Sequence, residues 1–372
     1  MRSWTVAVTG LNATDNPAPG TGVIRSLRAD PQWDGRIVGL AYDALDTAAY
    51  DSDLVDEVHL IPYPGAGAGS VRQRLLEIHR QTPIDVLIPT LDSELANFVR
   101  LAPELARLGI HTLLPDERCL RLRSKVELYS FCASHGIRSP RTAIMHRPGA
   151  AWRLDLPYPV AVKGQYHGAY IAHSPDEAAM YFDRIHKRWG GPVLAQQFVT
   201  GEEYDVLMLG DRGGHLVGAV PMRKLGITDQ GKAWSGVTVR DPNLLGQSRA
   251  IFEALHWSGP LELEFVREQV TGDFHLIEIN PRFPSWCYLS VGAGQNLPLA
   301  CARMAQGEIV EPLPEARPGI TFVRHAVDLL CPLTHLESLV TSGSLVHRPS
   351  QPSQPSRSGH PSKIEIGGAV HA

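Results

Sequence analysis

The first 115 residues alternate between short apolar runs and longer amphipathic segments. The apolar runs lie at 4–9, 36–41, 57–61 and 84–89, and each is short enough for a strand. Apolar residues recur at helical spacing from about Val23 and in the segments 70–81 and 92–108. This alternation of strands and helices predicts a parallel α/β sheet with helices on both faces.

The pattern changes after Pro115. Helical spacing is found at 119–135, 175–189 and 244–255, and strand-like runs at 158–163, 193–199, 204–209, 215–221, 261–266 and 274–280. Glycines 213 and 214 separate two of these runs and predict a hairpin. We therefore expect a second, α+β region in which most strands are antiparallel.

The last part of the chain, from about Glu337, has a different composition. Two Gln-Pro-Ser units occupy 351–353 and 354–356. Such segments have few apolar side chains to offset the entropy lost on ordering. We expect a largely flexible Pro/Ser-rich tail.

The strongest candidate chemistry lies on the last two predicted strands. Strand alternation places Glu262 and Glu264 on one face of the first strand, and Glu278 and Asn280 on one face of the second. A hairpin centred on Thr271 would set Glu264 opposite Glu278. Two opposed carboxylates among apolar neighbours repel each other and lose hydration, and a divalent cation relieves both effects. Oxygen donors suit Mg²⁺ or Mn²⁺ rather than zinc.

Two other interpretations of these acids stay open. They could lie on a solvated sheet face, or pair with Arg267 and Arg282. They could also form the acid/base couple of a glycosidase, although nothing else in the sequence supports a sugar cleft.

Several separated cations form the second candidate. Lys163 ends an apolar strand and precedes the loop 164–168, Lys125 lies at the start of a helical segment, and Arg223 and Lys224 end a strand. Each of these is usually a solvated surface charge. Combined with a pair of metal-binding acids, however, they are typical of phosphoryl transfer, in which fixed cations hold the phosphates and a metal bridges them.

Composition narrows the class of protein. With 372 residues, 43% of them hydrophobic and 20% charged, the chain is neither a coiled coil, nor a collagen, nor a fully disordered protein. A net charge of −4 gives no overall basic field for nucleic acid or a membrane surface, and no apolar run reaches the roughly 20 residues of a membrane span. The five cysteines include no C-x-x-C pair, which favours a reducing cytoplasm over a disulfide framework.

Glycines follow the first predicted strand at positions 10, 20 and 22. They could cradle a phosphate, but their spacing is not the G-x-G-x-x-G of dinucleotide folds. A substrate-facing or structural turn is the favoured interpretation, and a dinucleotide-dependent oxidoreductase is disfavoured.

Seven segments in a fixed order carry a family resemblance: IDVLIPTLDSEL (84–95), LRSKVELYSFCASHGIRSPRT (122–142), YPVAVKG (158–164), LAQQFVTGEEYDV (194–206), LELEF (261–265), LIEINPRF (276–283) and GAGQNLPLACARMAQGE (292–308). Over about residues 1–312 the chain resembles the ATP-grasp carboxylate–amine ligases, near the branch related to the large subunit of carbamoyl phosphate synthetase. The resemblance implies a parallel-sheet pre-ATP-grasp domain at 1–115. It implies an ATP-grasp fold of two α+β subdomains at 116–200 and 201–335, and a C-terminal extension at 336–372.

The resemblance also assigns roles to residues. Lys125 and Lys163 match phosphate-binding lysines, and Glu203 matches the ribose-binding acid. The hinge that holds adenine is matched by Gln196, Gln197 and Val199, and the Mg²⁺ ligands are matched by Glu264, Glu278 and Asn280. Arg282 matches the arginine that steadies the γ-phosphate or acyl phosphate, and Arg223 is a second candidate for that role.

By the same resemblance, the chain is expected to be an ATP- and Mg²⁺-dependent enzyme that activates a carboxylate as an acyl phosphate and transfers it to an amine. The expected partners are small-molecule or peptide carboxylates and amines, with no nucleic acid and no membrane, and a homodimer is left open. One departure from the family is Trp286, which stands in place of a small, glycine-rich continuation. It leaves a different class of protein open, a non-catalytic homologue that binds nucleotide or peptide.

Overall fold

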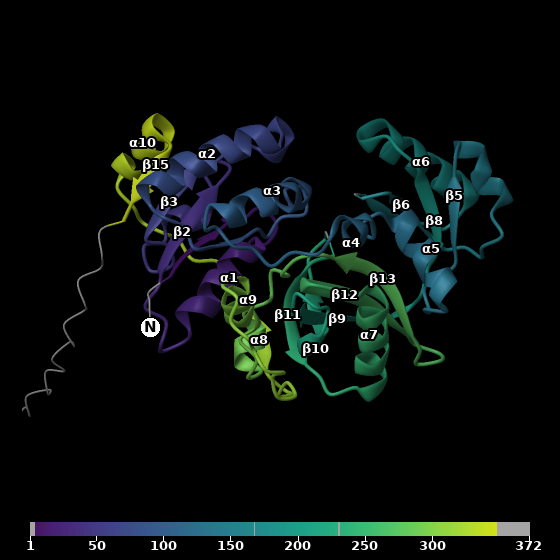
Figure 1. The fold of residues 1–372 in the computed structure, drawn as a ribbon. Coiled ribbons are helices and arrows are strands. Elements are labelled where there is room, and N and C mark those ends of the chain that lie inside the picture. Colours follow the sequence, from purple (N-terminus) through teal and green to yellow (C-terminus); the bar gives the residue numbers. More distant parts are fainter. Residues whose placement is uncertain (1–3, 167, 230, 348–372) are drawn as a thin grey trace, which may run out of the picture.

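The computed structural model describes residues 4–166, 168–229 and 231–347 (Figure 1). Within these ranges the strands form three sheets. A parallel sheet lies in the N-terminal part, a small antiparallel sheet follows it, and a large antiparallel sheet is formed by the later residues. This arrangement confirms the α/β and α+β fold class predicted from the sequence.

The N-terminal sheet has the strand order β15-β3-β2-β1-β4. Its parallel strands are β1 (Thr5–Val8), β2 (Arg36–Ala41), β3 (Glu57–Leu60) and β4 (Val86–Ile88), connected through α1 (Pro19–Arg28), η1 (Thr47–Tyr50), η2 (Pro64–Ala66) and α2 (Ala68–Gln81), with α3 (Leu95–Arg107) after β4. On β1, Val6 and Val8 pack in the cluster that includes α1, whereas Ala7 packs in the cluster that includes α2 and α3. Both faces of the sheet are therefore covered, which explains why its strands are apolar throughout.

The small sheet has the order β5-β8-β6-β7. Its strands are β5 (Thr142–Met145), β6 (Val160–Gly164), β7 (Ala169–Ala172) and β8 (Val193–Gln197), and α6 (Pro175–Trp189) and η3 (Pro148–Arg153) pack with them. Helix α6 begins where the sequence predicts, because the Ser174 hydroxyl accepts a hydrogen bond from the Glu177 N–H and Pro175 occupies the first turn.

The segment 119–135 was expected to form one helix, and this prediction is wrong. The structure has α4 (Glu117–Arg121) and α5 (Lys125–His135), with a break between them. Ser124 is extended at the break, and its hydroxyl accepts a hydrogen bond from Gln165 Nε2 (2.9 Å). The Lys125 N–H donates to the Gln165 carbonyl (3.2 Å), so a contact with the loop after β6 decides where α5 begins.

The large sheet has the order β13-β12-β9-β10-β11-β14. Its strands are β9 (Gly201–Gly210), β10 (Leu216–Ile227), β11 (Ala233–Thr238), β12 (Gly259–Glu268), β13 (Phe274–Asn280) and β14 (Thr321–Val323). Helix α7 (Pro242–Leu255) packs on one face. On the other face, α8 (Leu289–Gly292) and α9 (Leu297–Ala305) join the cluster that contains α1 (Figure 1). That shared cluster fixes the large sheet against the N-terminal sheet.

Of the expected C-terminal extension, the structure describes residues 336–347. They form most of helix α10 (Leu333–Ser342) and strand β15 (Ser344–Val346), and β15 pairs antiparallel with β3. The Gln-Pro-Ser units lie outside the described residues. None of the helices in the described ranges is both long and apolar enough to cross a membrane.

Candidate active site

The β12–β13 hairpin presents its acids on one face. The alternate, apolar residues of β12 are buried against α7, so Glu262 and Glu264 lie on the opposite face. Glu264 pairs in register with Glu278, and Glu262 with Asn280, as expected of a hairpin centred on Thr271. The register shifts by one residue immediately after Glu264, so the predicted pairing holds where the acids lie.

A buried lysine lies between the acids of neighbouring strands. The Nζ atom of Lys224 is 3.0 Å from Glu203 Oε2, 3.0 Å from Glu264 Oε2 and 3.3 Å from Asp205 Oδ1, and its side chain is only 4% exposed. Burial would lower the pKa of Lys224, but the three carboxylates raise it well above its usual range. Burial would raise the pKa of Glu264, yet Lys224 holds it below the usual range. Lys224 is therefore a permanent cation in this cluster.

The structure does not bring Arg223 to the cluster. On β10, Met222 and Lys224 share one face, and Arg223 points to the other, where its Nη1 atom lies 2.8 Å from Glu202 Oε1. The sequence indicated Lys224 only as one of several separated cations, and the resemblance gave the site role to Arg223. Strand alternation distinguishes the two, since Lys224 is in phase with Met222 along the strand.

Glu262 is held by three donors. Trp286 Nε1 donates to Glu262 Oε1 (2.7 Å), while Asn280 Nδ2 (3.0 Å) and Arg282 Nη1 (3.3 Å) donate to Oε2. Burial and the neighbouring Glu264 charge raise the pKa of Glu262 to about 7, although Arg282 opposes them. Trp286 therefore fixes an acid beside the metal-ligand candidates, which gives this departure from the family pattern a structural role.

Arg282 also joins the hairpin to the N-terminal sheet. Its Nε atom lies 3.0 Å from Oδ2 of Asp92, which follows β4. The Oδ1 atom of Asp92 lies 3.4 Å from Nε of Arg123, in the break between α4 and α5. Asp92 thus links three parts of the chain at the edge of the acid cluster.

The two predicted phosphate-binding lysines reach the same region from other elements. Lys125, at the first position of α5, places Nζ 3.4 Å from Glu278 Oε2. Lys163 lies near the end of β6. Burial and the Lys125 charge lower the pKa of Lys163 to about 8, against the pull of nearby carboxylates. Two lysines and the hairpin acids are therefore electrostatic neighbours although they lie far apart in sequence.

The predicted hinge connects β8 of the small sheet to β9 of the large sheet. Gln196 is 2% exposed, and its Nε2 atom donates to Thr142 Oγ1 (3.1 Å). The Gln197 N–H donates to the Arg141 carbonyl (2.8 Å). This N–H is already used, so an adenine would have to use other backbone groups of the hinge, such as the N–H of Val199.

Comparison with known proteins identifies the fold that carries this cluster. Residues 191–326, which include the hinge, β9 to β13 and the acid cluster, match the model of a family described as ATP-grasp in the biosynthetic pathway with Ter operon. The chain has the ATP-grasp fold. The resemblance drawn from the seven motifs is thereby confirmed at the level of the ATP-grasp fold.

Several solved structures share the fold over most of this chain. The biotin carboxylase domain of 2-oxoglutarate carboxylase from Hydrogenobacter thermophilus, in complex with MgADP, ADP and bicarbonate, is 16% identical with a TM-score of 0.64, covering 85% of this chain and 72% of that one. An L-amino acid ligase from Bacillus licheniformis is 16% identical with a TM-score of 0.59, and the match covers 83% of this chain and 75% of the ligase chain. N5-carboxyaminoimidazole synthetase from Staphylococcus aureus is 13% identical with a TM-score of 0.60, and the match covers 84% of this chain and 79% of the synthetase chain.

The residues predicted to bind metal fit magnesium by their donor chemistry. No three His, Cys, Asp or Glu side chains within the described ranges gather as a metal site of their own. The set here is two carboxylates and an amide, Glu264, Glu278 and Asn280. Asn280 donates through Nδ2 to Glu264 Oε1 (2.8 Å), which leaves its carbonyl oxygen as a donor to metal. Mg²⁺ usually takes only one or two carboxylates and completes its shell with water and phosphate oxygens, so an incomplete set suits it.

The three glycines that follow β1, of which Gly20 and Gly22 lie in α1, pack too tightly to leave room for a ligand at their α-carbons. A Cβ on Gly20 would lie 2.0 Å from the Thr9 carbonyl oxygen, and one on Gly22 would lie 2.8 Å from Cys287 Sγ. Gly10 has φ +71°, a conformation that favours glycine, and a Cβ there would meet Thr90 Oγ1 at 2.2 Å. These contacts support the structural interpretation of the turn.

Proposed function

We propose that this chain is an ATP- and magnesium-dependent ligase that activates a carboxylate as an acyl phosphate and joins it to an amine. The observation that carries the proposal is the convergence of Lys125, Lys163, Lys224 and Arg282 on the Glu264, Glu278 and Asn280 set. An anionic carboxylate attacking an anionic triphosphate requires fixed positive charge around the reacting oxygens. This cluster supplies it.

In the proposed reaction, the substrate carboxylate oxygen bonds to the γ-phosphorus, and ADP leaves. The amine then attacks the acyl carbon, inorganic phosphate leaves, and the amine loses a proton. Glu264, Glu278 and Asn280 would hold Mg²⁺, which supplies charge neutralisation at the phosphates when bound.

The protein's own groups would do the rest. Lys125 and Lys163 would bind phosphate oxygens, and Gln196, Gln197 and Val199 would hold adenine at the hinge. Arg282 would steady the transferred phosphoryl group, because Asp92 and Glu262 fix its guanidinium from two sides. Lys224 would hold the carboxylates of Glu203 and Glu264 in place for the ribose and the metal.

The test is phosphate release from ATP and Mg²⁺ in the presence of pooled amino acids and dipeptides, with mass detection of an amide product. We expect substrate-stimulated release in the wild type. Glu278→Gln keeps the side-chain shape but loses the charge, and should reduce that rate by about 100-fold or more.

Glu268→Gln is the matched control, since Glu268 ends the same hairpin strand away from the cluster. It should keep the wild-type rate. Nucleotide binding without any substrate-stimulated turnover would instead favour the non-catalytic homologue, and an unchanged rate in Glu278→Gln would rule out its metal role.

The same proposal places the enzyme in the cytoplasm with small-molecule or peptide substrates. Its five cysteines are free, and four of them are buried, which fits a reducing compartment. Whether it forms a homodimer stays a prediction that sedimentation velocity can test.

A further inference from the structure

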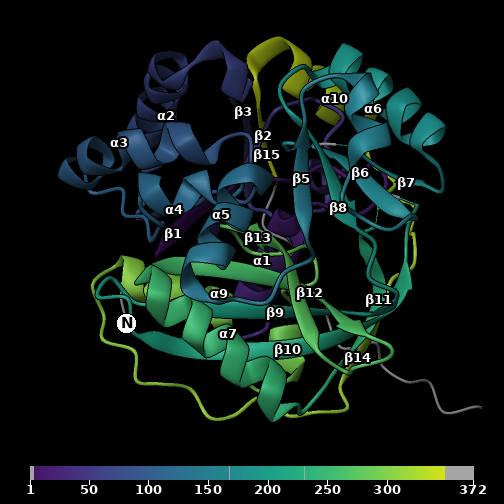
Figure 2. The same ribbon diagram turned by 90° about the vertical axis from the view of Figure 1, so that its right-hand side faces the viewer.

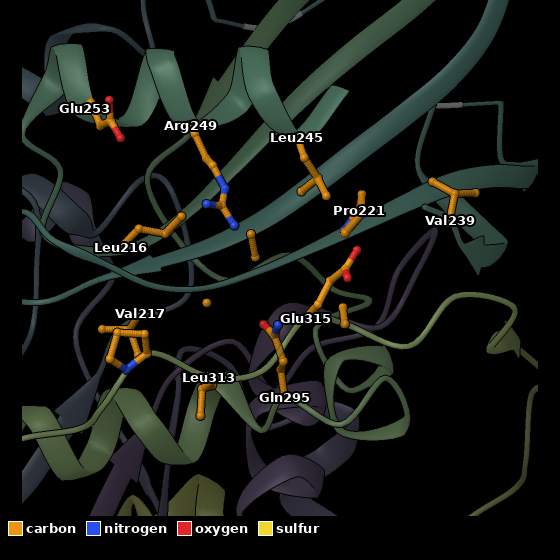
Figure 3. Close-up of a pocket in the computed structure, with 14 residues that line it drawn as sticks. Leu216, Val217, Pro221, Val239, Leu245, Arg249, Glu253, Gln295, Leu313 and Glu315 are labelled. Atoms are coloured by element: carbon orange, nitrogen blue, oxygen red, sulfur yellow. The ribbon is translucent and has the colours of Figure 1, made fainter. Parts of the chain in front are cut away.

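A cavity of about 220 Å³ lies between α7, the first half of β10 and the segment 312–316 (Figure 3). Its walls come from both faces of the large sheet, since Ala219 packs with α7, whereas Val217 and Leu313 pack with the cluster that contains α8 and α9. The cavity therefore lies at the edge of β10, before the pairing with β11 begins at Met222, and none of the residues that line it belongs to the acid cluster. It belongs to neither the proposed ATP site nor the hinge.

Two polar groups in this cavity have unused hydrogen-bonding capacity. Arg249 of α7 extends its guanidinium toward the cavity (Figure 3), and no ion pair or hydrogen bond of this side chain is found with another described residue. Gln295 is 2% exposed, yet its Oε1 atom has no hydrogen-bond partner among the described residues. A buried acceptor without a partner is costly, so this oxygen marks a place for a donor.

The orientation of the Gln295 amide is determined by its surroundings. Its Nε2 atom donates to the Pro314 carbonyl (2.6 Å), and the reverse orientation would set two oxygens against each other. Gly218 gives the amide its room, because a Cβ there would lie 2.7 Å from Oε1. The acceptor is thus built into the cavity by a glycine at a bulge of β10.

The remaining lining combines apolar walls with acids. The apolar walls include Leu216, Leu245 and Leu313, and two carboxylates, Glu253 and Glu315, also line the cavity. The volume is below the roughly 300–1,000 Å³ of pockets for drug-sized ligands, so the occupant is small. The walls favour a branched aliphatic group, and the acids disfavour a ligand with more than one negative charge.

We propose that this cavity binds an α-amino acid with a branched apolar side chain, at a site separate from the proposed catalytic one. The ligand carboxylate would pair with Arg249, its ammonium group would donate to Gln295 Oε1, and its side chain would contact the leucines. A monocarboxylate would leave the glutamine oxygen without a donor, and a simple amine would leave Arg249 without an anion.

The test is calorimetric titration of the full chain, without nucleotide, with L-leucine as the probe. Arg249→Gln removes the cation at an exposed position, and Leu245→Trp fills the cavity. Arg107→Gln, at an exposed arginine of α3 remote from the cavity, is the matched control. We expect leucine to bind the wild type and Arg107→Gln equally, and at least tenfold more weakly in both cavity variants.

Two analogues separate the polar contacts. 4-Methylpentanoate lacks the ammonium group and 3-methylbutylamine lacks the carboxylate, and each should bind at least tenfold more weakly than leucine. The proposal is overturned when leucine does not bind at millimolar concentration, when the cavity variants bind it as tightly as wild type does, or when either analogue matches it. Leucine that bound at the proposed catalytic site instead would bind the two cavity variants as tightly as it binds the wild type. The test of the cavity is therefore independent of the ligase proposal.

Discussion

Lys224 is the residue on which the charge balance of the acid cluster depends. Its Nζ atom is within 3.3 Å of three carboxylates, and the side chain is almost wholly buried. Because water does not reach this position, solvent cannot stabilise the carboxylates in place of the lysine. Burial raises the pKa of Asp205 well above its usual range even with Lys224 beside it. Removal of the lysine would leave these buried carboxylates without their nearest counter-charge.

We therefore expect Lys224→Met to lower the free energy of unfolding by about 3–5 kcal/mol. The measurement is urea denaturation at pH 7. Lys232→Met is the control, because Lys232 is half exposed and lies 3.7 Å from Asp15, an arrangement worth at most about 1 kcal/mol. Equal losses in the two variants would contradict the buried role of Lys224.

The lowered pKa of Lys163 leads to a prediction about how activity depends on pH. Its pKa is lowered to about 8 by burial and by Lys125, so its charge is lost as the pH rises through that value. Because kcat/KM reports groups of the free enzyme, kcat/KM for ATP should fall above about pH 8. In Lys163→Arg the guanidinium stays charged, and this fall should be absent. The same profile in both proteins would show that another group titrates.

At the scale of elements, the site is assembled from strands of the two antiparallel sheets and one helix. The hairpin β12–β13 carries the metal candidates, β10 carries Lys224, and α5 and β6 bring the phosphate lysines. The hinge joins the two antiparallel sheets beside these groups. Figure 1 shows α4 between the N-terminal sheet and the small sheet, and Figure 2 shows α5 beside β13, where the Tyr129 hydroxyl donates to the Ile277 carbonyl.

Gly20, at the start of α1, shows how closely this helix packs against the end of β1. A Cβ at Gly20 would meet backbone atoms, the carbonyl oxygens of Thr9 at 2.0 Å and Gly10 at 2.5 Å, which cannot rotate away. We expect Gly20→Ala to destabilise the protein by about 1–3 kcal/mol in thermal unfolding. Gly69→Ala, in α2 with nothing within 4 Å, should be neutral or add up to about 1 kcal/mol. Equal changes in stability for Gly20→Ala and Gly69→Ala would contradict a structural role for Gly20.

At the scale of the whole molecule, the segment 333–346 returns to the N-terminal sheet. Strand β15 covers the edge of β3, and Arg74 of α2 donates to the carbonyls of Leu60 (2.9 Å) and Gly343 (3.1 Å) at this junction. An open strand edge is a site for association between chains. The segment 333–346 therefore covers the edge of β3 with an edge strand of only 3 residues.

Leu339 is the buried residue of α10 and is fully shielded from solvent. We expect Leu339→Ala to lower stability by about 2–5 kcal/mol and to increase light scattering on heating, because β15 loses the support of α10. Its neighbour Val340 is 65% exposed, and Val340→Ala should change stability by less than about 0.5 kcal/mol. A leucine variant that matches this control would show that α10 does not hold β15.

The sequence by itself determined the elements and the local register. A period of two along β12 and β13, with a turn centred on Thr271, was enough to place Glu264 opposite Glu278, because strand alternation and hairpin pairing are short-range. Only the tertiary structure decided what surrounds these acids. The contacts of Lys224 with Glu264, of Trp286 with Glu262 and of Arg282 with Asp92 join residues that are 24 to 190 positions apart. Such contacts depend on how whole sheets pack, and the same packing ended α4 early and turned the C-terminal segment into α10 and β15.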